Sequence, residues 1–326
     1  MIDWSRFVEL IHKHERFLLT SHIRPDCDAL GSELGMAGVL DSLGKDVQIV
    51  NGQKTPPNLA WIDPHQRIRA IGADVQLADL ADREVLLVLD TSAWQQLGDM
   101  ALVLRNTAAK KAVLDHHVSE DDLGAEAFKN VQAEATGRLV LEAAGHLGVR
   151  LTPEIATPLF AAIATDTGWF RFSSTTGDTY RFAGQLVDAG ANPTDIYRAL
   201  YEQDTLPRLQ LIGRTLARTQ AEFAGRLIHT VIYQDDFKAT GALPSDTEDV
   251  VNMTLTVAGT QVAVIFVEQP NGKFKISFRS RSAVDCSRLA EQFAGGGHKA
   301  AAGAMVDGPF AAAQQQVLDA VRAAMK

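Results

Sequence analysis

One short stretch near the N-terminus combines three residues that could bind a metal ion. His22, Asp26 and Asp28 follow directly on the apolar run Phe17–Thr20. Because Pro25 disfavours helical backbone at the residue before it, we expect the three side chains on a loop that leads into a helix starting near Asp28. Imidazole and carboxylates together suit a hard divalent ion such as Mn²⁺ or Mg²⁺. A lone histidine in such a place is more often structural, so the stretch by itself is only a candidate metal site.

Two more apolar runs end in residues of the same kind. Val85–Leu89 ends in Asp90, and the run 112–114 ends in Asp115–His117. A predicted helix over 153–165 leads into a further candidate ligand, Asp166. Parallel strands deliver their carboxyl ends to one edge of a sheet, where such folds bind ligands. We therefore expect six side chains to converge there: His22, Asp26, Asp28, Asp90, His116 and Asp166.

The charge of this set favours a pair of metal ions. Taken singly, Asp90 and Asp166 are ordinary cap or turn residues. Four carboxylates gathered in one place would repel each other, whereas two divalent cations would balance their charge. Two such ions can activate a water molecule and stabilise an in-line displacement at phosphorus. The pattern as a whole therefore predicts a dinuclear phosphoesterase centre.

The order of these motifs carries a family resemblance. His22-x-x-Pro-Asp26-x-Asp28, Asp90, Asp115-His116-His117 and Asp166 resemble, in sequence order, the four motifs of the DHH phosphoesterase superfamily. The resemblance implies one metal held by His22, Asp26 and Asp90. It implies a second held by Asp28, Asp90, His116 and Asp166, with Asp90 shared. Mn²⁺ is the metal implied, with Mg²⁺ or Co²⁺ as alternatives.

The same resemblance gives roles to neighbouring residues. Asp115 would orient a histidine, and His117 would face the scissile phosphate; these two are the expected catalytic residues. Cys27 occupies a place that usually holds a small residue, and we interpret it as structural.

A glycine-rich motif near the C-terminus is the second signal. Gly295, Gly296 and Gly297 precede His298, and consecutive glycines let backbone N–H groups surround an anion. Arg279 lies upstream in a basic stretch with aromatic residues, a combination that suits a short nucleotide. The plainer interpretation is a glycine turn beside a solvated, charged strand. The motif resembles the accessory domain of the RecJ and NrnA branches of the family, which implies that Arg279 and residues 295–298 bind substrate.

The elements that must position these residues predict an α/β fold. We expect a doubly wound, mainly parallel sheet in a catalytic domain over residues 1–190, and a helical linker over 191–222. From residue 223 to 326 the pattern changes to a smaller α/β domain with strands near 227–233, 262–268 and 273–278. Asn271-Gly272 is a hairpin signal between the last two strands, and the glycine-rich motif is expected as a loop.

Composition excludes several classes of protein. The chain of 326 residues has 46% hydrophobic and 22% charged residues and a net charge of −9, so it is an ordinary globular chain and a poor binder of long duplex nucleic acid. There is no apolar run of membrane-spanning length and no signal-peptide pattern, so we expect a cytoplasmic protein that does not enter the membrane. Two distant cysteines give no disulfide framework.

The resemblance to the NrnA type implies the substrates. These are short RNA oligonucleotides, including linear dinucleotides, and 3′-phosphoadenosine 5′-phosphate (pAp). Hydrolysis of inorganic pyrophosphate or polyphosphate is the alternative, and a catalytically silent nucleotide-binding module is another. A homodimer is compatible with the resemblance, although the sequence offers no interface signal of its own.

Overall fold

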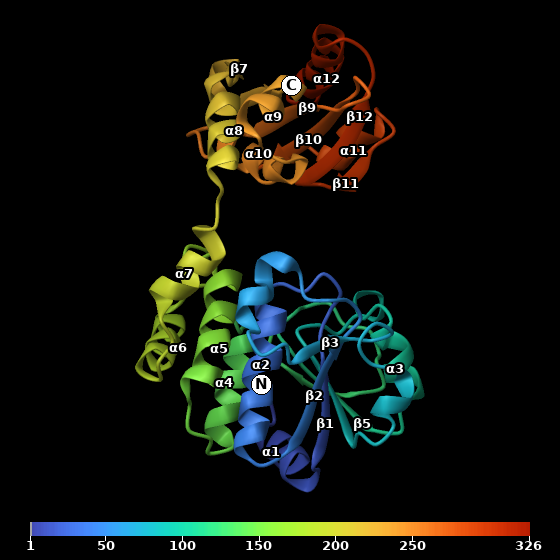
Figure 1. Ribbon diagram of the computed structural model, residues 1–326, viewed down its shortest axis with the longest axis vertical. Coiled ribbons are helices and arrows are strands. Elements are labelled where there is room, and N and C mark those ends of the chain that lie inside the picture. The colour runs from blue at the N-terminus through green and yellow to red at the C-terminus, as the bar shows by residue number, and fades with distance from the viewer. Residues whose placement is uncertain (1) are drawn as a thin grey trace. The chain divides into compact units, whose positions relative to one another are not determined.

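The protein consists of two compact units, and each is described by itself. The computed structural model describes residues 2–326. Unit 1 extends to Gln203, and unit 2 is Asp204–Lys326. The helical segment expected as a linker over 191–222 is divided between them: helix α7 (Pro193–Tyr201) belongs to unit 1, and helix α8 (Leu206–Ala217) belongs to unit 2 (Figure 1).

Unit 1 is built on a six-stranded parallel sheet, as the sequence predicts. Its strands are β1 (Arg16–Thr20), β2 (Asp46–Asn51), β3 (Ile68–Ala70), β4 (Val85–Leu89), β5 (Lys110–Asp115) and β6 (Glu126–Lys129). Their order is β3-β2-β1-β4-β5-β6, and each neighbouring pair is parallel. The chain runs outward from β1 on one side and from β4 on the other. The boundary between β1 and β4 is therefore the switch point at which doubly wound folds place their ligands.

Helices cover both faces of this sheet (Figure 1). They are α1 (Trp4–Lys13), α2 (Cys27–Ser42), α3 (Met100–Asn106), α4 (Thr136–His146), α5 (Pro153–Asp166), α6 (Gly177–Asp188) and α7, with short 3₁₀ helices η1 (Pro57–Ile62), η2 (Leu77–Leu80) and η3 (Trp94–Gln96). Every residue of β4 is buried, but alternate side chains enter different cores. Val85, Leu87 and Leu89 pack with α1, α2, α4 and α5, whereas Leu86 and Val88 pack with α3. This is why β4 is apolar along its whole length.

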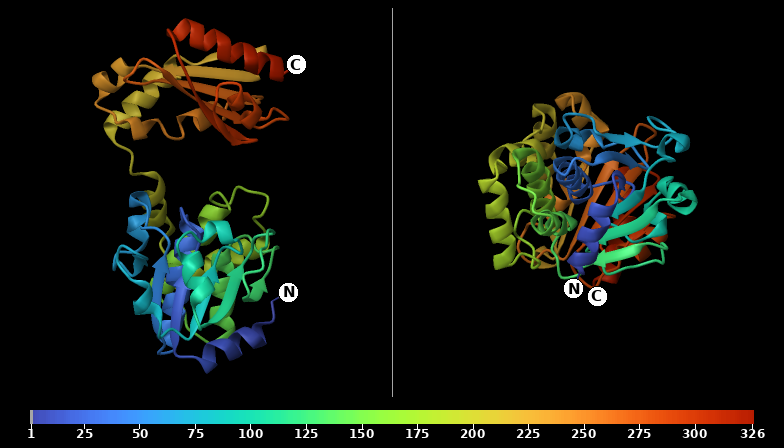
Figure 2. Two further views of the ribbon diagram at one scale, coloured as in Figure 1. Left: turned by 90° about the vertical axis from the view of Figure 1, so that its right-hand side faces the viewer. Right: turned by 90° about the horizontal axis from the view of Figure 1, so that it is seen from below.

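Unit 2 contains a mixed sheet of six strands. These are β7 (Gln220–Glu222), β8 (Leu227–Ile232), β9 (Val262–Glu268), β10 (Phe274–Ser280), β11 (Gly296–His298) and β12 (Ala301–Val306), in the order β11-β12-β10-β9-β8-β7. Its helices are α8, α9 (Gln234–Thr240), α10 (Val250–Thr254), α11 (Cys286–Glu291) and α12 (Phe310–Ala324), with η4 (Phe223–Gly225) and η5 (Pro244–Thr247). Helix α12 lies across one face of the sheet (Figure 2). Among the described residues, no helix has the length and apolarity needed to span a membrane.

The glycine-rich motif differs locally from the expectation. Gly296–His298 forms the edge strand β11 rather than a loop, and it pairs antiparallel with β12. Neither segment is rich in the β-branched and aromatic residues that favour strands, so the sequence carries no strand signal there. The hairpin between β9 and β10 is present at Asn271-Gly272, with Gly272 in a left-handed conformation (φ 76°).

Candidate metal centre

Three neighbouring strands carry the candidate ligands to one edge of the unit 1 sheet. β1 leads to His22, β4 ends immediately before Asp90, and β5 leads to His116. The six predicted ligands and the predicted catalytic residue His117 fall into groups whose nitrogen and oxygen atoms lie within 4.8 Å of one another. These groups are His22–Asp26–Asp90, Asp28–His116–Asp166 and Asp90–His116–His117. All six residues predicted to converge therefore do so, at the switch point between β1 and β4.

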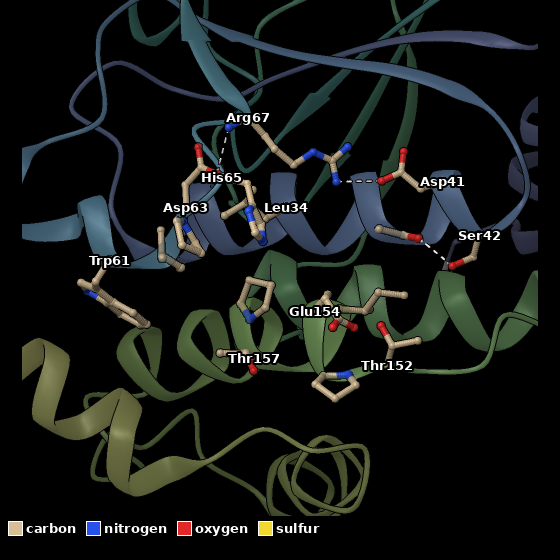
Figure 3. A pocket seen from close by; sticks show the side chains of 16 residues that line it. Leu34, Asp41, Ser42, Trp61, Asp63, His65, Arg67, Thr152, Glu154 and Thr157 are labelled. Atoms are coloured by element: carbon tan, nitrogen blue, oxygen red, sulfur yellow. Dashed lines mark hydrogen bonds and ion pairs between the residues drawn. The ribbon is translucent and has the colours of Figure 1, made fainter.

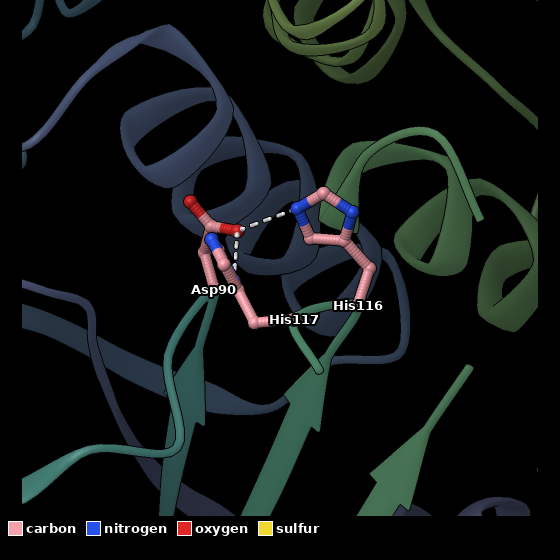
Figure 4. Close-up of side chains that lie close together, drawn as sticks. All are labelled: Asp90, His116 and His117. Carbon is pink, nitrogen blue, oxygen red and sulfur yellow. Dashed lines mark ion pairs between the residues drawn. The ribbon is translucent and has the colours of Figure 1, made fainter. Parts of the chain in front are cut away.

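His116 stands at the centre of this cluster. Its Nε2 lies 3.7 Å from a carboxylate oxygen of Asp28, 3.6 Å from Asp90 and 3.5 Å from Asp166. Figure 4 shows both histidine rings beside the same oxygen of Asp90, with His116 Nε2 at 3.6 Å and His117 Nδ1 at 3.7 Å from Oδ1. On the other side of the cluster, His22 Nε2 is 3.4 Å from Asp90 Oδ2. Asp90 is thus the carboxylate that both halves of the cluster share.

Backbone carbonyl groups fix the orientation of the imidazoles of His22 and His116. His22 Nδ1 lies 3.0 Å from the carbonyl oxygen of Ile23, and His116 Nδ1 lies 3.1 Å from that of Ala133. A carbonyl can only accept, so each Nδ1 carries the proton and donates it. Each Nε2 then presents its lone pair to the carboxylates, which is the usual arrangement of a metal-binding histidine.

The start of α4 holds the two most buried carboxylates among the predicted ligands, Asp28 and Asp90. The backbone N–H groups of Thr136 and Gly137 donate to the two oxygens of Asp28, each at 2.8 Å, and the Thr136 hydroxyl donates to Asp90 at 2.9 Å. Asp28 and Asp90 are almost completely buried. Burial and then the neighbouring carboxylates raise the pKa of both groups well above the usual value. The sequence predicts the helix at 136 but not this contact, because 108 residues separate Thr136 from Asp28.

Asp115 contacts His117, one of the two histidines that it could orient. Asp115 Oδ1 accepts from His117 Nδ1 at 2.9 Å and from the His117 backbone N–H at 3.0 Å. Burial acts to raise the pKa of Asp115, but the bonds from His117 and Ser92 outweigh it and lower that pKa to about 2. The same hydrogen bond raises the pKa of His117. Lys129 Nζ lies 3.3 Å from Asp115, and no pattern in the sequence indicates Ser92 or Lys129 as partners of this carboxylate.

Asp26 and Cys27 show how the loop enters α2. The Asp26 carboxylate caps the helix by accepting from the backbone N–H groups of Asp28 and Ala29, at 3.0 and 3.1 Å. Asp26 therefore positions Asp28 while lying within the ligand cluster itself. Cys27 is buried, and burial followed by the nearby Asp26 and Asp28 raises the pKa of its thiol to about 12. A thiol held protonated in this way is a poor metal ligand, which agrees with a structural role.

The residues of this cluster fit a hard divalent metal ion. Buried like charges are costly unless a cation compensates them or they take up protons. Two imidazole nitrogens with free lone pairs point into a set of carboxylates that share one residue, Asp90. Nitrogen and oxygen donors of this kind suit Mn²⁺ or Mg²⁺. The cluster can therefore hold metal.

A different cavity of unit 1 lacks these properties. It measures about 520 Å³ and lies between η1, α2 and α5 (Figure 3). Three of its charged groups already have partners: Arg67 pairs with Asp41 at 2.7 Å, and the Asp63 carboxylate accepts from two backbone N–H groups. None of the six predicted ligands lines it. It is a separate feature of the domain.

In unit 2 two of the predicted substrate-binding residues, Arg279 and His298, share one row of the sheet. Arg279 of β10 and His298 of β11 are both opposite Ala301 of β12, so their side chains lie on the same face. Two strand spacings, roughly 10 Å, separate them. Gly295 and Gly297 are required by packing, because an added Cβ would lie 2.2 Å from the carbonyl oxygen of Gly303 and 2.5 Å from Cα of Ala302, respectively. Only Gly296 faces open space.

Family models match both units. The DHH family N-terminal domain matches residues 16–163, and the DHHA1 domain matches residues 227–326. A protein of Thermus thermophilus named bifunctional oligoribonuclease and PAP phosphatase NrnA is 29% identical over 93% of this chain and 88% of its own length. The Bacillus subtilis protein of the same name is 26% identical over 93% of both chains.

Solved structures agree with this assignment. An exopolyphosphatase-related protein from Bacteroides fragilis superposes with a TM-score of 0.81 at 25% identity, covering 98% of this chain and 94% of that one. An exonuclease RecJ bound to manganese has a TM-score of 0.54 at 14% identity, covering 100% and 95% of the two chains, and shares the fold. The order of the ligand motifs, their convergence beside β1 and β4, and these matches agree: the chain belongs to the DHH family, with a DHH domain followed by a DHHA1 domain.

Proposed function

We propose that this protein is a metal-dependent phosphoesterase with two activities. It hydrolyses short oligoribonucleotides and linear dinucleotides to mononucleotides, and it converts pAp and water to AMP and inorganic phosphate. The relatives named for both activities cover more than nine-tenths of this chain. The observation that carries the proposal is the cluster around His116 Nε2, which lies within 3.7 Å of carboxylates from Asp28, Asp90 and Asp166.

Two divalent ions are proposed for the cluster, with Mn²⁺ as the preferred metal. His22, Asp26 and Asp90 would hold one ion, and Asp28, Asp90, His116 and Asp166 would hold the other. Bound there, the metal would supply positive charge for the phosphate and would lower the pKa of water so that it could act as a nucleophile. The N–H groups at the start of α4 fix Asp28 so that little reorganisation accompanies metal binding.

His117 is proposed to act on the phosphate. Its Nδ1 donates to Asp115, which leaves Nε2 for the substrate, and its side chain is 44% exposed. Because Asp115 raises the pKa of His117, a larger share of the imidazole is protonated near neutral pH. A protonated Nε2 can donate a hydrogen bond to a phosphoryl oxygen or a proton to the leaving oxygen. Asp115 acts through His117 as a positioning residue.

Unit 2 is proposed to bind the substrate. Arg279 and residues Gly295–His298 would take a phosphate of the nucleotide, as the row through Ala301 allows. Arg279 offers a planar guanidinium suited to phosphate. The protein is proposed to act in the cytoplasm without binding long duplexes or membrane, and its homodimeric state is a further proposal.

The test is hydrolysis of four substrates by the full-length protein, with Mn²⁺ and with chelator. These are a 5′-phosphorylated RNA dinucleotide, pAp, pyrophosphate and a polyphosphate. We expect Mn²⁺-dependent release of mononucleotides from the first and of phosphate from the second. Turnover of the inorganic substrates alone would overturn the substrate assignment in favour of the activity that the name of the Bacteroides fragilis protein suggests. Nucleotide binding without turnover of any of the four would favour a binding module.

A further inference from the structure

Lys129 lies outside the four sequence motifs, but it contacts the pair formed by Asp115 and His117. It is the last residue of β6, and the parallel register places it directly opposite Asp115, the last residue of β5. Residues paired in this way have their side chains on the same face of the sheet. The Lys129 side chain is 11% exposed, whereas exposed lysines are the rule. Lys129 is therefore a packed part of the sheet edge rather than a solvated surface cation.

Three oxygen atoms surround the ammonium group of Lys129. Nζ donates to the Ser119 carbonyl at 3.0 Å and lies 3.3 Å from Asp115 Oδ2 and 3.5 Å from a carboxylate oxygen of Glu120. An ammonium group has three N–H donors, one for each of these oxygens. Both ends of the segment 115–119 are thus bound to the same nitrogen atom. We call this arrangement of Lys129, Asp115, Ser119 and Glu120 the lysine clamp.

The segment that the lysine clamp closes carries both histidines of the motif. His116 and His117 lie between its two bound ends, and every residue from His117 to Asp122 is exposed, with Val118 at 85%. The next buried apolar side chain along this loop is Leu123. Because burial does not hold the loop in place before that residue, its conformation depends on polar contacts.

The two histidines depend on the lysine clamp to different degrees. His116 has an anchor of its own, because its Nδ1 donates to a backbone carbonyl outside the segment. Both hydrogen bonds that the structure describes for His117, from its backbone N–H and from Nδ1, go to Asp115 Oδ1. The other oxygen of Asp115 is held by Lys129 and Ser92. Loss of Lys129 should therefore affect the position of His117 more than that of His116.

A separate contact holds the far end of the same loop. The Asp121 carboxylate accepts from the backbone N–H of Trp94 at 2.8 Å, and the backbone N–H of Asp121 donates to the Ser92 carbonyl at 2.8 Å. These bonds connect the loop to the segment after Asp90, but they act four residues beyond His117. Without the lysine clamp the loop should stay attached there, while the segment that carries His117 becomes looser.

We propose that Lys129 is a positioning residue for His117. It closes the segment 115–119 and so fixes the imidazole that acts on the phosphate, without contacting substrate or metal itself. The inference rests on the proposed function and adds to it a residue outside the four motifs. Since His116 has a separate anchor, metal binding should not depend on Lys129.

A double-mutant cycle on the full-length protein measures whether Lys129 acts through His117. Lys129→Met keeps the aliphatic stem and removes the ammonium group. For the RNA dinucleotide at saturating Mn²⁺, we expect kcat to fall about tenfold or more, with KM and the Mn²⁺-dependent rise in melting temperature close to those of the wild type. In a His117→Ala protein the same change should lower kcat by less than about twofold. Equal losses in both backgrounds would show a purely structural role and overturn the proposal.

Hydrogen exchange reports on the lysine clamp without any turnover. The backbone N–H of His117 is bonded to Asp115, so peptides covering residues 116–122 should exchange about tenfold faster in Lys129→Met. Peptides of β4 should exchange at the wild-type rate. If Lys129→Met does not fold, Glu120→Lys provides the same test at an exposed residue, because it places a second cation beside the ammonium group. Wild-type exchange of residues 116–122 in the variant that folds would overturn the proposal.

Two control variants make matched changes elsewhere in unit 1. Lys110→Met removes a lysine of β5 that pairs with Glu126 at 3.2 Å. Asp99→Lys reverses the charge of an exposed aspartate that makes no capping bond, as Glu120→Lys reverses a charge in the loop. Both controls should keep the kcat and the exchange rates of the wild type. A loss in the controls as large as in Lys129→Met or Glu120→Lys would mean that charge alone causes it, and would also overturn the proposal.

Turnover by the wild type separates this inference from the proposed function. Hydrolysis of the RNA dinucleotide with unchanged exchange in Lys129→Met keeps the proposed function and removes the positioning role. Faster exchange in Lys129→Met without turnover by the wild type keeps the lysine clamp as a structural feature and removes the phosphoesterase.

Discussion

Replacing Asp90 with asparagine tests whether the cluster is a metal centre or a structural network. Asp90 is 1% exposed, and its side chain belongs to two of the three ligand groups. Its backbone is left-handed (φ 61°), a conformation that asparagine tolerates and alanine does not. Asparagine can also still accept the hydrogen bond from Thr136. The substitution therefore removes a charge and changes little else.

The expected effects differ in sign with and without metal. In chelator, Asp90→Asn removes a buried carboxylate whose pKa is raised by burial and by Asp26, so the melting temperature should stay equal or rise. With Mn²⁺ at 100 times its dissociation constant, the wild type should gain about 2.7 kcal/mol. At about 2–4 °C per kcal/mol, that is a rise of roughly 5–11 °C. The variant should lose most of this rise, since both proposed metal positions share Asp90.

The assay is a thermal unfolding scan of both proteins with Mn²⁺ and with chelator, followed by hydrolysis of an RNA dinucleotide. Asp99→Asn, at an exposed aspartate with no side-chain capping bond, is the control and should behave as wild type. Loss of about 4 kcal/mol of transition-state stabilisation would lower turnover about 10³-fold. An Asp90→Asn protein that keeps the full Mn²⁺-dependent rise, or that is strongly destabilised in chelator, would refute the reasoning.

Four more substitutions test three further points: the buried Glu33, the Asp115–His117 hydrogen bond and the packing of the glycine motif. Burial raises the pKa of Glu33 to about 7 from 4.5, so the folded state retains a proton that the unfolded state loses, and stability falls as pH rises between those values. Between pH 4.5 and 7.5, the free energy of unfolding of the wild type should fall by up to about 3 kcal/mol more than that of Glu33→Gln. Urea unfolding in chelator at the two pH values measures this. If the difference in stability between the two proteins is the same at both pH values, the prediction is wrong. Asp115→Asn should lower the pKa of His117, move the alkaline limb of the pH–rate profile to lower pH, and reduce kcat about 10–100-fold; an unmoved profile would show that His117 does not titrate in turnover. Gly296→Ala, with open space around the new Cβ, should fold normally, whereas Gly295→Ala should lose roughly 1–3 kcal/mol in chemical denaturation; equal losses would contradict the packing argument.

The sequence predicts the candidate ligands because each is marked by a local pattern. A short apolar run stops at a polar residue, as at Leu89 and Asp90, and the topology of a parallel sheet then brings such ends together. Partners that complete the site are not local. Lys129 reaches Asp115 from β6, a strand with only one buried residue, and Thr136 donates to Asp28 from far along the chain. No periodicity or motif carries that information.

The glycine motif is a pattern that is clear in the sequence but compatible with two explanations, anion binding and close packing of strands. The expectation was an anion-binding loop, and Gly295 and Gly297 are instead explained by their close approach to β12. The motif places His298 in the row of Arg279 because its glycines let β11 pack tightly against Ala301–Gly303. Packing and substrate binding are thus not alternatives here, since the first produces the geometry that the second would need.

Opposing forces on Asp28 explain why such a cluster is built at the start of a helix. Burial favours the protonated carboxyl, but N–H groups of Thr136 and Gly137 donate to both oxygens and favour the carboxylate. The N–H donors alone do not keep Asp28 ionised, because burial and the negative charges of Asp90 and Asp166 all raise its pKa. A bound cation removes the repulsion and lets the N–H donors act fully. Metal binding and folding stability should therefore be linked through Asp28, with the linkage strongest above the pH at which the metal-free cluster gives up its protons.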